Sequence, residues 1–195
     1  MTKPITPYCA WAPIDDELYR HYHDTEWGIP IYDDQLLFEK LILDGFQAGL
    51  SWRTILYKRE AFRKAFDNFD PVKIARYTDK KVERLLNDSA IVRSNTKIRA
   101  TIGNAQAWLK IMEEGEGAFS KFLWDFVDGK PLVNKHKNFR DAPVKSPESE
   151  AMSKALKKHG FKFCGPVIVY AFMQAVGMIN DHELACPRHK AVQRV

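Results

Sequence analysis

Residues 146–177 read SPESEAMSKALKKHGFKFCGPVIVYAFMQAVG, and this stretch decides the fold of the chain. Ser146, which is followed by proline, is typical of the start of a helix, and Gly160 can end that helix. Gly165, also followed by proline, begins a second and apolar helix that Gly177 closes. The stretch therefore predicts two helices joined by a short turn that contains glycine.

The turn between these two helices carries features that can hold a phosphate group. Lysines surround it, a glycine lets another backbone approach closely, and the N-terminus of the second helix favours an anion. Such groups grip a nucleic-acid backbone without reading its base sequence. We take Lys162 and Gly165 as the candidate contacts with a DNA backbone. The alternative is a lysine-rich turn that is only solvated.

The helical pattern continues through most of the chain. Further helices are predicted from capping residues and apolar stripes that begin near Asp33, Ser51, Asp70, Thr78, Lys97 and Phe119. Residues 129–145 are polar and lysine-rich, and they indicate a loop or a connection between lobes. Runs of β-branched residues with period two are nearly absent. We therefore expect an all-α fold of about eight to ten helices.

Composition excludes several classes of protein. The 195 residues are 45% hydrophobic and 28% charged, which is typical of a globular domain and not of a disordered chain, a collagen or a coiled-coil rod. No run of apolar residues is long enough to span a membrane, and the N-terminus carries no secretory signal pattern, so we expect a cytoplasmic protein. The net charge of +5 is compatible with a polyanionic partner.

Cysteines and histidines near the two ends of the chain form a candidate metal site. Cys9 and His23 lie near the N-terminus, while His182 and Cys186 are four residues apart near the C-terminus. Two cysteines and two histidines suit tetrahedral zinc, and a site built from both ends would close a very long loop. The alternative is two buried cysteines and two ordinary histidines. The third cysteine, Cys164, is expected to be a buried packing residue.

A carboxylate in the stretch LILDGFQAGLSW lies on the apolar face of its own helix. Asp44 follows Leu41 by three residues and precedes Ala48 by four, so the three share one face. A carboxylate in such a place costs free energy unless it is paired or functional. Asp44 is therefore a candidate site residue. The alternative is that it ends the helix or meets a lysine or arginine in the core.

Aromatic residues gather in the N-terminal quarter of the chain, namely Trp11, Tyr19, Tyr22, Trp27 and Trp52. Tyr19 and Tyr22 are three residues apart and so lie on one face of a helix. The set either packs as a core cluster or forms the walls of a pocket that sandwiches a flat ring.

Together these elements resemble the DNA-3-methyladenine glycosylase I family, within the helix-hairpin-helix glycosylases. The resemblance rests on strings that run in order from residue 9 to residue 186. They are Cys9-Ala-Trp11, YHDTEWG (22–28), QAGLSW (47–52), FDPVKIA (69–75), SKALKKHGFKF (153–163), GPVIVYAFMQAVGMINDH (165–182) and Cys186. Several of these strings are long and unusual, and they cover almost the whole chain.

The resemblance implies a fold and a metal. It implies a helix-hairpin-helix glycosylase fold in which residues 1–195 form one domain of two helical lobes with a base pocket between them. It also implies one structural zinc ion per chain that joins the N- and C-terminal segments through Cys9, His23, His182 and Cys186. Four protein ligands close a zinc site, so the ion would stabilise the fold and would not activate water.

The resemblance also implies the reaction and its residues. The expected substrate is double-stranded DNA containing 3-methyladenine, which a monomeric enzyme flips out and cleaves at its N-glycosidic bond to leave an abasic site. Trp52 would stack on the extruded base, with Trp11 and Tyr19 as further pocket walls. Tyr22 and Asp44 are the expected catalytic pair, with Tyr22 bonding the edge of the base. The carboxylate of Asp44 would favour a base made cationic by methylation.

Two positions leave questions open. A member of the family carries glutamate where this chain has Asp44, so the carboxylate here is one methylene shorter. Either the helix lies closer to the base, a water bridges the gap, or the preferred lesion differs. Asp181 stands where many hairpin glycosylases place an aspartate that assists water. The resemblance is to the subgroup that works without this aspartate, so we expect Asp181 to be structural and to orient His182.

Three other functions compete with this interpretation. A zinc hydrolase could use the same cysteines and histidines, but it needs an open coordination position on the metal. The chain could also be a glycosylase redirected to another alkylated base. A DNA protein that binds lesions without cleaving them is the third alternative.

Overall fold

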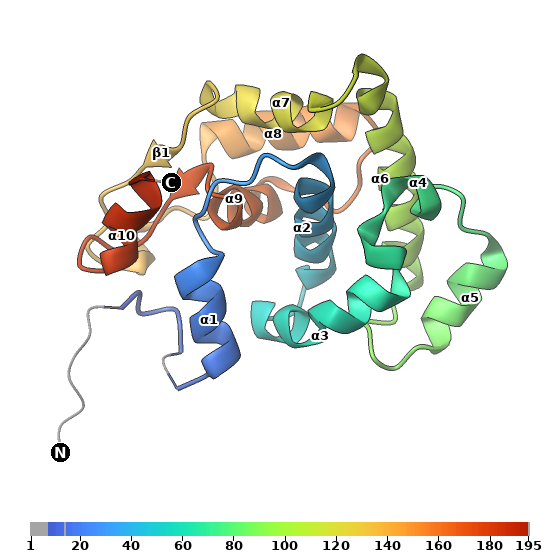
Figure 1. The fold of residues 1–195 in the computed structure, drawn as a ribbon, viewed down its shortest axis with the longest axis horizontal. Helices are drawn as coiled ribbons and strands as arrows, with labels where there is room; N and C mark the ends of the chain where they lie inside the picture. The colour runs from blue at the N-terminus through green and yellow to red at the C-terminus, as the bar shows by residue number, and fades with distance from the viewer. Residues whose placement is uncertain (1–7, 14, 195) are drawn as a thin grey trace.

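The computed structural model describes residues 8–13 and 15–194, and helices dominate them (Figure 1). The α-helices are α1 (Glu17–Thr25), α2 (Asp34–Gln47), α3 (Trp52–Ala65), α4 (Pro71–Ile74), α5 (Asp79–Asn87), α6 (Asn95–Ile111), α7 (Ala118–Trp124), α8 (Pro147–Lys158), α9 (Pro166–Ala175) and α10 (Pro187–Ala191). Short 3₁₀ turns connect several of them. The expected mostly helical fold is confirmed.

Capping residues set the starts of α2, α3 and α8 as the sequence predicts, whereas Thr78, the predicted cap of α5, forms no side-chain capping bond. The side chain of Asp33 accepts a hydrogen bond from the backbone of Leu36 at the start of α2. Ser51 caps α3 in the same way, and it thereby places Trp52 at the first helical position. Ser146 and Ser149 bond reciprocally at the start of α8. Local chemistry therefore fixes where the pocket-bearing helices begin.

Helix α2 lies at the centre of the molecule and packs against α3, α6, α7 and α9 (Figure 1). Its side chains from Leu37 to Phe46 are buried on nearly every side, except for the partly exposed Lys40. The central position of α2 explains why it carries few exposed polar residues after its first turn. It also means that a charged side chain on α2, such as Asp44, needs a partner or a function.

The segment expected to be a loop contains a short strand. Leu132–Val133 (β1) pairs in parallel with Ile179–Asn180 (β2), so the expectation of an entirely irregular segment at 129–145 is corrected there. Two residues make too short a strand for a periodic signal in the sequence. The pairing ties the segment between α7 and α8 to the C-terminal part of the chain.

The N-terminal segment and the C-terminal segment meet beside α1 (Figure 1). The carboxylate of Glu183 accepts hydrogen bonds from the backbone of Ala10 at 3.1 Å and of Phe139 at 3.0 Å. One buried side chain therefore joins three segments that are distant in sequence. No helix among the described residues is both long enough and apolar enough to cross a membrane.

Candidate functional site

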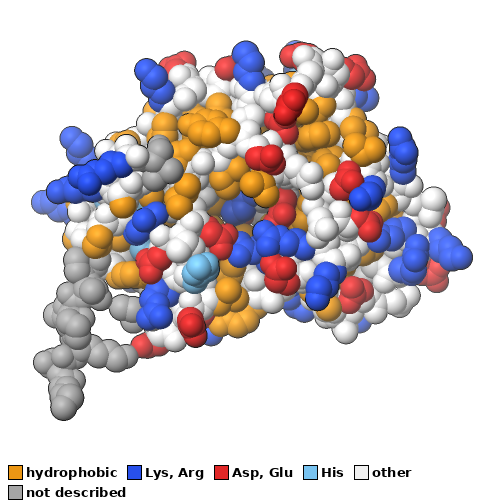
Figure 2. Space-filling model, viewed as in Figure 1, with side chains coloured by type: hydrophobic (Ala, Val, Ile, Leu, Met, Phe, Trp, Pro, Cys, Tyr) orange, Lys and Arg blue, Asp and Glu red, His pale blue; other side chains and the backbone are white. Residues whose placement is uncertain are grey.

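A pocket opens between α1, α2, α3 and α9, and it has a volume of about 200 Å³. Its walls are mostly aromatic and apolar, and a few polar groups reach into it. The lining residues are Trp11, Tyr19, Tyr22, Trp27, Lys40, Asp44, Gln47, Trp52, Phe139, Ala142, Ala171, Gln174, Ala175 and Asp181. Figure 2 shows a hollow near the middle of one face, with apolar side chains and charged side chains of both signs around it. Such a lining suits a flat ligand with a polar edge.

The aromatic residues of the N-terminal quarter form walls of this pocket. The rings of Tyr22 and Trp52 lie 5.3 Å apart between centroids and are tilted by 43°. Trp11 packs edge-on against Tyr19 at 5.8 Å and against Trp27 at 4.7 Å. The structure thus brings together all five aromatic residues that the sequence singled out.

A cap at the start of α1 orients its two tyrosines. One oxygen of Asp16 accepts hydrogen bonds from the backbone of Tyr19 at 3.1 Å and from the hydroxyl of Tyr57 at 2.8 Å. The second bond ties the start of α1 to α3. Because Tyr19 and Tyr22 lie one turn apart on α1, both rings then face the pocket.

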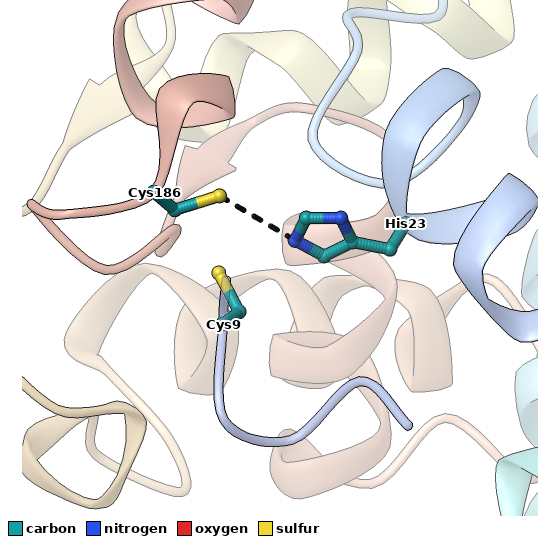
Figure 3. A group of neighbouring side chains, drawn as sticks. All are labelled: Cys9, His23 and Cys186. Atoms are coloured by element: carbon teal, nitrogen blue, oxygen red, sulfur yellow. Dashed lines mark hydrogen bonds between the residues drawn. The ribbon is translucent and has the colours of Figure 1, made fainter. Parts of the chain in front are cut away.

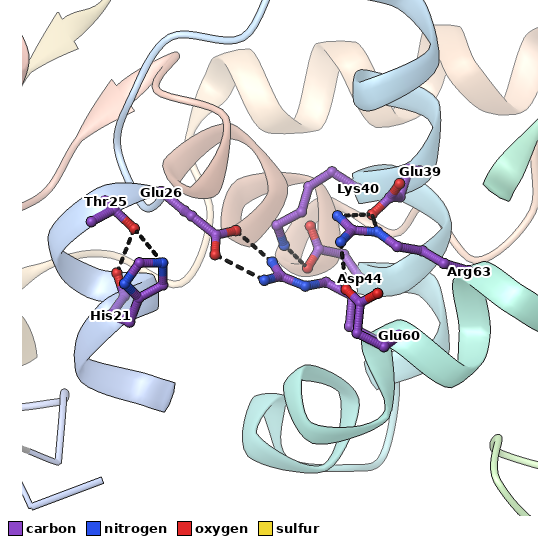
Figure 4. A network of polar contacts seen from close by, with 9 residues as sticks. His21, Thr25, Glu26, Glu39, Lys40, Asp44, Glu60 and Arg63 are labelled. Carbon is purple, nitrogen blue, oxygen red and sulfur yellow. Dashed lines mark hydrogen bonds and ion pairs between the residues drawn. The ribbon is translucent and has the colours of Figure 1, made fainter. Parts of the chain in front are cut away.

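Asp44 is buried on α2 and forms an ion pair with Lys40, one helical turn earlier (Figure 4). The Lys40 Nζ lies 2.5 Å from the Asp44 Oδ1 atom and 3.8 Å from the centroid of the Trp52 ring. The sequence left open whether Asp44 serves a site or meets a basic residue in the core. The structure shows the pairing with a lysine, and it places the pair in the wall of the pocket.

Polar atoms without a hydrogen-bond partner gather at the pocket. Among the described residues, Asp44 Oδ2, Trp11 Nε1 and Trp52 Nε1 are buried and form no hydrogen bond. A buried polar atom without a partner costs about 1–3 kcal/mol. One acceptor and two donors in one pocket are therefore groups that a polar ligand can satisfy.

Burial shifts the ionisation of the polar groups in the pocket. It raises the pKa of the Asp44 carboxyl, although the positive charge of Lys40 opposes this shift. It lowers the pKa of Lys40, and the carboxylate of Asp44 opposes that shift. Burial also raises the pKa of Tyr22 well above its ordinary value, so the phenol keeps its proton and can donate a hydrogen bond.

Asp181 also borders the pocket, but its carboxylate is fully engaged. One oxygen accepts from the side chain of Asn134 at 2.6 Å and lies 3.2 Å from His136 Nε2. The other oxygen accepts from the Tyr170 hydroxyl at 2.6 Å and from the Gln174 amide at 2.7 Å. Three hydrogen bonds, from Asn134, Tyr170 and Gln174, hold Asp181 as a structural link between α9, β2 and the 129–145 segment.

Three of the four expected metal ligands converge in the structure (Figure 3). The ligand atoms of Cys9, His23 and Cys186 are buried and lie within 4.8 Å of one another. The Cys186 Sγ atom is 3.7 Å from the His23 Nε2 atom. Sulfur and nitrogen ligands of one tetrahedral zinc ion lie about 3.5 Å apart, so this pair has a suitable spacing.

The ionisation of one of these groups fits metal binding. A hydrogen bond with Cys9 lowers the pKa of Cys186, and His23 contributes to that shift, whereas the same hydrogen bond raises the pKa of Cys9. The thiolate is the form that binds a metal. The Nδ1 atom of His23 lies 3.0 Å from an oxygen of Asp24, which leaves Nε2 directed toward the cysteines.

His182 lies beside this group without belonging to it. Its ring centroid is 5.1 Å from that of His23, and its Nε2 atom is buried without a hydrogen-bond partner among the described residues. Its Nδ1 atom lies 3.1 Å from the side-chain oxygen of Asn180. Asn180, and not Asp181 as the sequence suggested, therefore orients this imidazole. An unpartnered buried Nε2 fits a fourth metal ligand.

Helices α8 and α9 form the hairpin that the sequence predicts, with a turn at residues 159–165. The side chain of Lys162 is exposed, but its backbone N–H donates to Asn104 Oδ1 at 2.8 Å. Only the side chain of Lys162 can therefore reach a phosphate. Gly165 is the N-cap of α9. The turn also packs on α2, because a side chain at Gly45 would lie 3.3 Å from Phe163.

Two functional positions were not singled out from the sequence. Lys40 was missed, although its spacing of four residues from Asp44 is the signal of a helical ion pair. Asn180 was missed because nothing in the local sequence shows which residue faces the Nδ1 atom of His182. Both contacts depend on side-chain direction, which the residue types alone do not give.

The fold and the pocket together define a helical protein with one aromatic site for a flat base and a cysteine–histidine cluster between its ends. The family model for methyladenine glycosylases matches residues 11–189. The chain therefore belongs to the DNA-3-methyladenine glycosylase I family.

Individual relatives agree with this assignment. The chain is 49% identical over 178 residues to DNA-3-methyladenine glycosylase 1 of Escherichia coli, covering 91% of this chain and 94% of that protein. It is 46% identical to DNA-3-methyladenine glycosylase of Haemophilus influenzae over 183 residues, 94% of this chain and 98% of that protein.

Solved structures extend the agreement to three dimensions. A crystal structure of 3-methyladenine DNA glycosylase I (TAG) matches with a TM-score of 0.89 at 48% identity, covering 92% of this chain and 98% of that one. A crystal structure of a variant of a 3-methyladenine DNA glycosylase I (TAG) in complex with 3-methyladenine matches with a TM-score of 0.88 at 41% identity, over 92% of this chain and 96% of that one.

Proposed function

We propose that this chain is a monofunctional DNA glycosylase that releases 3-methyladenine from alkylated double-stranded DNA and leaves an abasic site. The observation that carries the proposal is the aromatic pocket with an unpartnered carboxylate oxygen at Asp44. Relatives that are nearly half identical are named for this activity. A base inside a duplex cannot reach such a pocket, so the enzyme must first flip it out of the stack.

In this proposal the extruded base stacks on Trp52, and Asp44 Oδ2 accepts a hydrogen bond from the edge of the base. Tyr22 is protonated and can donate to another edge atom. Trp11 and Tyr19 close the remaining sides of the pocket. Filling the pocket satisfies buried polar atoms that have no partner within the protein, which favours binding of a polar ring.

The bond to the sugar breaks without a conventional general base on the protein. Methylation at N3 gives the adenine ring a positive charge, so the ring leaves as a neutral base with little acid assistance. Water then captures the oxocarbenium-like sugar. Both oxygens of Asp181 are occupied by protein donors, which supports a structural role for that carboxylate. The residues of this chain therefore contribute mainly position and electrostatics.

The hairpin is proposed to hold the DNA backbone. The exposed side chain of Lys162 and the N-terminus of α9 at Gly165 can contact a phosphate. Beside the pocket, Leu50 is 41% exposed and Val167 is 54% exposed. Apolar side chains at the mouth of a base pocket can fill the gap that a flipped base leaves in the duplex, and we assign Leu50 and Val167 this role.

We propose that one zinc ion binds to Cys9, His23, His182 and Cys186. Two observations support this donor set. The ligand atoms of Cys9, His23 and Cys186 lie within 4.8 Å of one another, and the Nε2 atom of His182 has no hydrogen-bond partner among the described residues. Four protein ligands leave no open position, so the ion would stabilise the junction of the chain ends and would not act as a hydrolytic centre. This argues against a zinc hydrolase.

We further propose that the enzyme acts as a monomer on DNA in the cytoplasm and that its two groups of helices form one domain.

Base release from N-methylated duplex DNA, with chromatographic identification of the freed bases, tests the activity. We expect 3-methyladenine to be released. Release of a different base alone would show a pocket redirected to another lesion. DNA binding without any release would show a protein that binds lesions and does not cleave them. Either of these two results would overturn the proposal.

A further inference from the structure

Lys40 is a charged residue in the pocket that the proposed chemistry does not use. It extends from α2 toward Asp44 (Figure 4), and its ammonium group lies over the Trp52 ring. Its side chain is only 13% exposed, and its Nζ atom lies 2.5 Å from Asp44 Oδ1 and 3.8 Å from the Trp52 ring centroid. A carboxylate and the face of an indole both attract cations. The ammonium group therefore occupies the place that would attract a cationic base.

The charges around this position balance in pairs. Lys40 neutralises Asp44, and the next pair, Glu26 and Arg59, is joined by two hydrogen bonds, one of them 2.8 Å long. A wall made of Asp44 and Trp52 alone would carry a net negative charge and would favour a positively charged ring. With Lys40 present, the same wall has no net charge.

We propose that Lys40 is a specificity-determining residue that offsets the charge of Asp44, so that the pocket accepts neutral purines as well as cationic ones. This inference rests on the proposed function. It concerns the class of base that the pocket selects. The carboxylate of Asp44 and the indole of Trp52 alone would strongly prefer a positively charged base, and we expect Lys40 to weaken that preference.

The energetic argument compares the two kinds of base in the same pocket. A neutral base can bind while Lys40 stays paired with Asp44, because the free Oδ2 atom of Asp44 still accepts a hydrogen bond. A cationic base either lies close to the ammonium group or displaces it from Asp44 and Trp52. Repulsion between the two positive charges acts on the cationic base alone, so Lys40 lowers the discrimination between the two kinds of base.

Calorimetric titration with two free ligands tests the inference. The ligands are 3-methyladenine, which is neutral at mildly alkaline pH, and 3,9-dimethyladeninium, which is a permanent cation with a similar ring. Dissociation constants are measured for the unmodified protein and for Lys40→Met, which removes the charge and keeps an unbranched side chain. Lys64→Met is the matched control, because Lys64 is exposed on α3 and lies outside the pocket lining.

We expect Lys40→Met to shift the ratio of the two dissociation constants toward the cation by about 10- to 100-fold, since the substitution removes a positive charge that repels the cationic ligand in a partly buried site. Lys64→Met should leave the ratio unchanged. Lys40→Gln, which keeps a hydrogen-bond donor but not the charge, should behave like Lys40→Met.

Several results would overturn the inference. Equal weakening of both ligands in Lys40→Met would show that Lys40 only supports the wall. If Lys40→Gln keeps the original ratio of the two dissociation constants, a hydrogen bond from residue 40, and not its charge, determines the selectivity between the ligands. Failure of the unmodified protein to bind either ligand would instead overturn the proposed function itself, and this inference with it.

Discussion

Asp44 concentrates the chemistry of the pocket in one side chain. Its position on the apolar face of α2 was evident from the spacing of residues, and the structure adds that one oxygen is paired with Lys40 and the other has no partner. The carboxylate is therefore held by a lysine one helical turn earlier. The pair explains how a carboxylate can remain buried on the central helix.

Replacing Asp44 with asparagine should slow base release while the pocket keeps its shape. Loss of a hydrogen bond to a charged group costs about 1.5–3 kcal/mol, which corresponds to a decrease of about 10- to 100-fold in the single-turnover rate. Asp44→Glu is the control, because it keeps the carboxylate, and we expect it to retain activity. Full activity in Asp44→Asn would rule out a direct role for the charge.

Replacing Trp52 with alanine should reduce catalysis far more than it reduces affinity for DNA. The indole stacks on the base in our proposal, whereas backbone contacts supply most of the affinity for a duplex. Rates of base release and binding to undamaged duplex should be measured on the same preparation. If Trp52→Ala releases 3-methyladenine at the original rate, Trp52 does not form the stacking surface.

At the scale of elements, most of the fold could be predicted because its determinants are local. Capping residues and apolar stripes gave the helices from α2 to α9, including the hairpin of α8 and α9. The β1–β2 pairing could not be predicted, because two residues at 132–133 meet two residues at 179–180 and neither pair carries a periodic pattern. Contacts between distant segments leave no signal of this kind in a single sequence.

The turn after α9 depends on a glycine that no other residue can replace. Gly177 has a φ of +75°, and a Cβ atom there would lie 2.4 Å from the backbone nitrogen of Pro30. We expect Gly177→Ala to lower the free energy of unfolding by about 3 kcal/mol or more, since both strain and a backbone clash are introduced. Denaturant unfolding monitored by circular dichroism measures this change.

Gly129 provides the matched control for that experiment. It also has a left-handed backbone, with a φ of +70°, but nothing lies within 4 Å of a Cβ atom built there. Gly129→Ala should therefore cost only the conformational strain of about 1–2 kcal/mol. If both variants lose the same free energy of unfolding, the contact between the turn after α9 and the segment before α2 does not contribute to stability.

At the scale of the whole molecule, the two ends of the chain form one structural unit beside the pocket. Cys9 and His23 come from the first part of the chain, and Cys186 comes from the last. The sequence allowed two interpretations of these residues, and neither composition nor spacing could decide between them because the two halves are far apart. The structure brings three of the four together, which local patterns could not show.

Removing zinc should destabilise the protein, because the proposed ion links both ends of the chain. We expect about one zinc ion per chain by elemental analysis, and a clear decrease in the melting temperature when a strong chelator is present. Cys164→Ser is the control, since Cys164 is buried elsewhere and should leave the metal content unchanged. A metal-free protein that unfolds at the original temperature would contradict a structural role for zinc.

The central claim is that the pocket beside Asp44 binds the lesion base, and an NMR titration with free 3-methyladenine tests it most directly. Trp11 and Trp52 line the pocket, whereas Trp108 packs in the main core and Trp124 donates its indole N–H to Ile31 at 2.8 Å. We predict that the indole N–H signals of Trp11 and Trp52 shift on binding and that those of Trp108 and Trp124 stay in place. Absence of any shift at saturating base, or shifts confined to Trp108 and Trp124, would contradict the account.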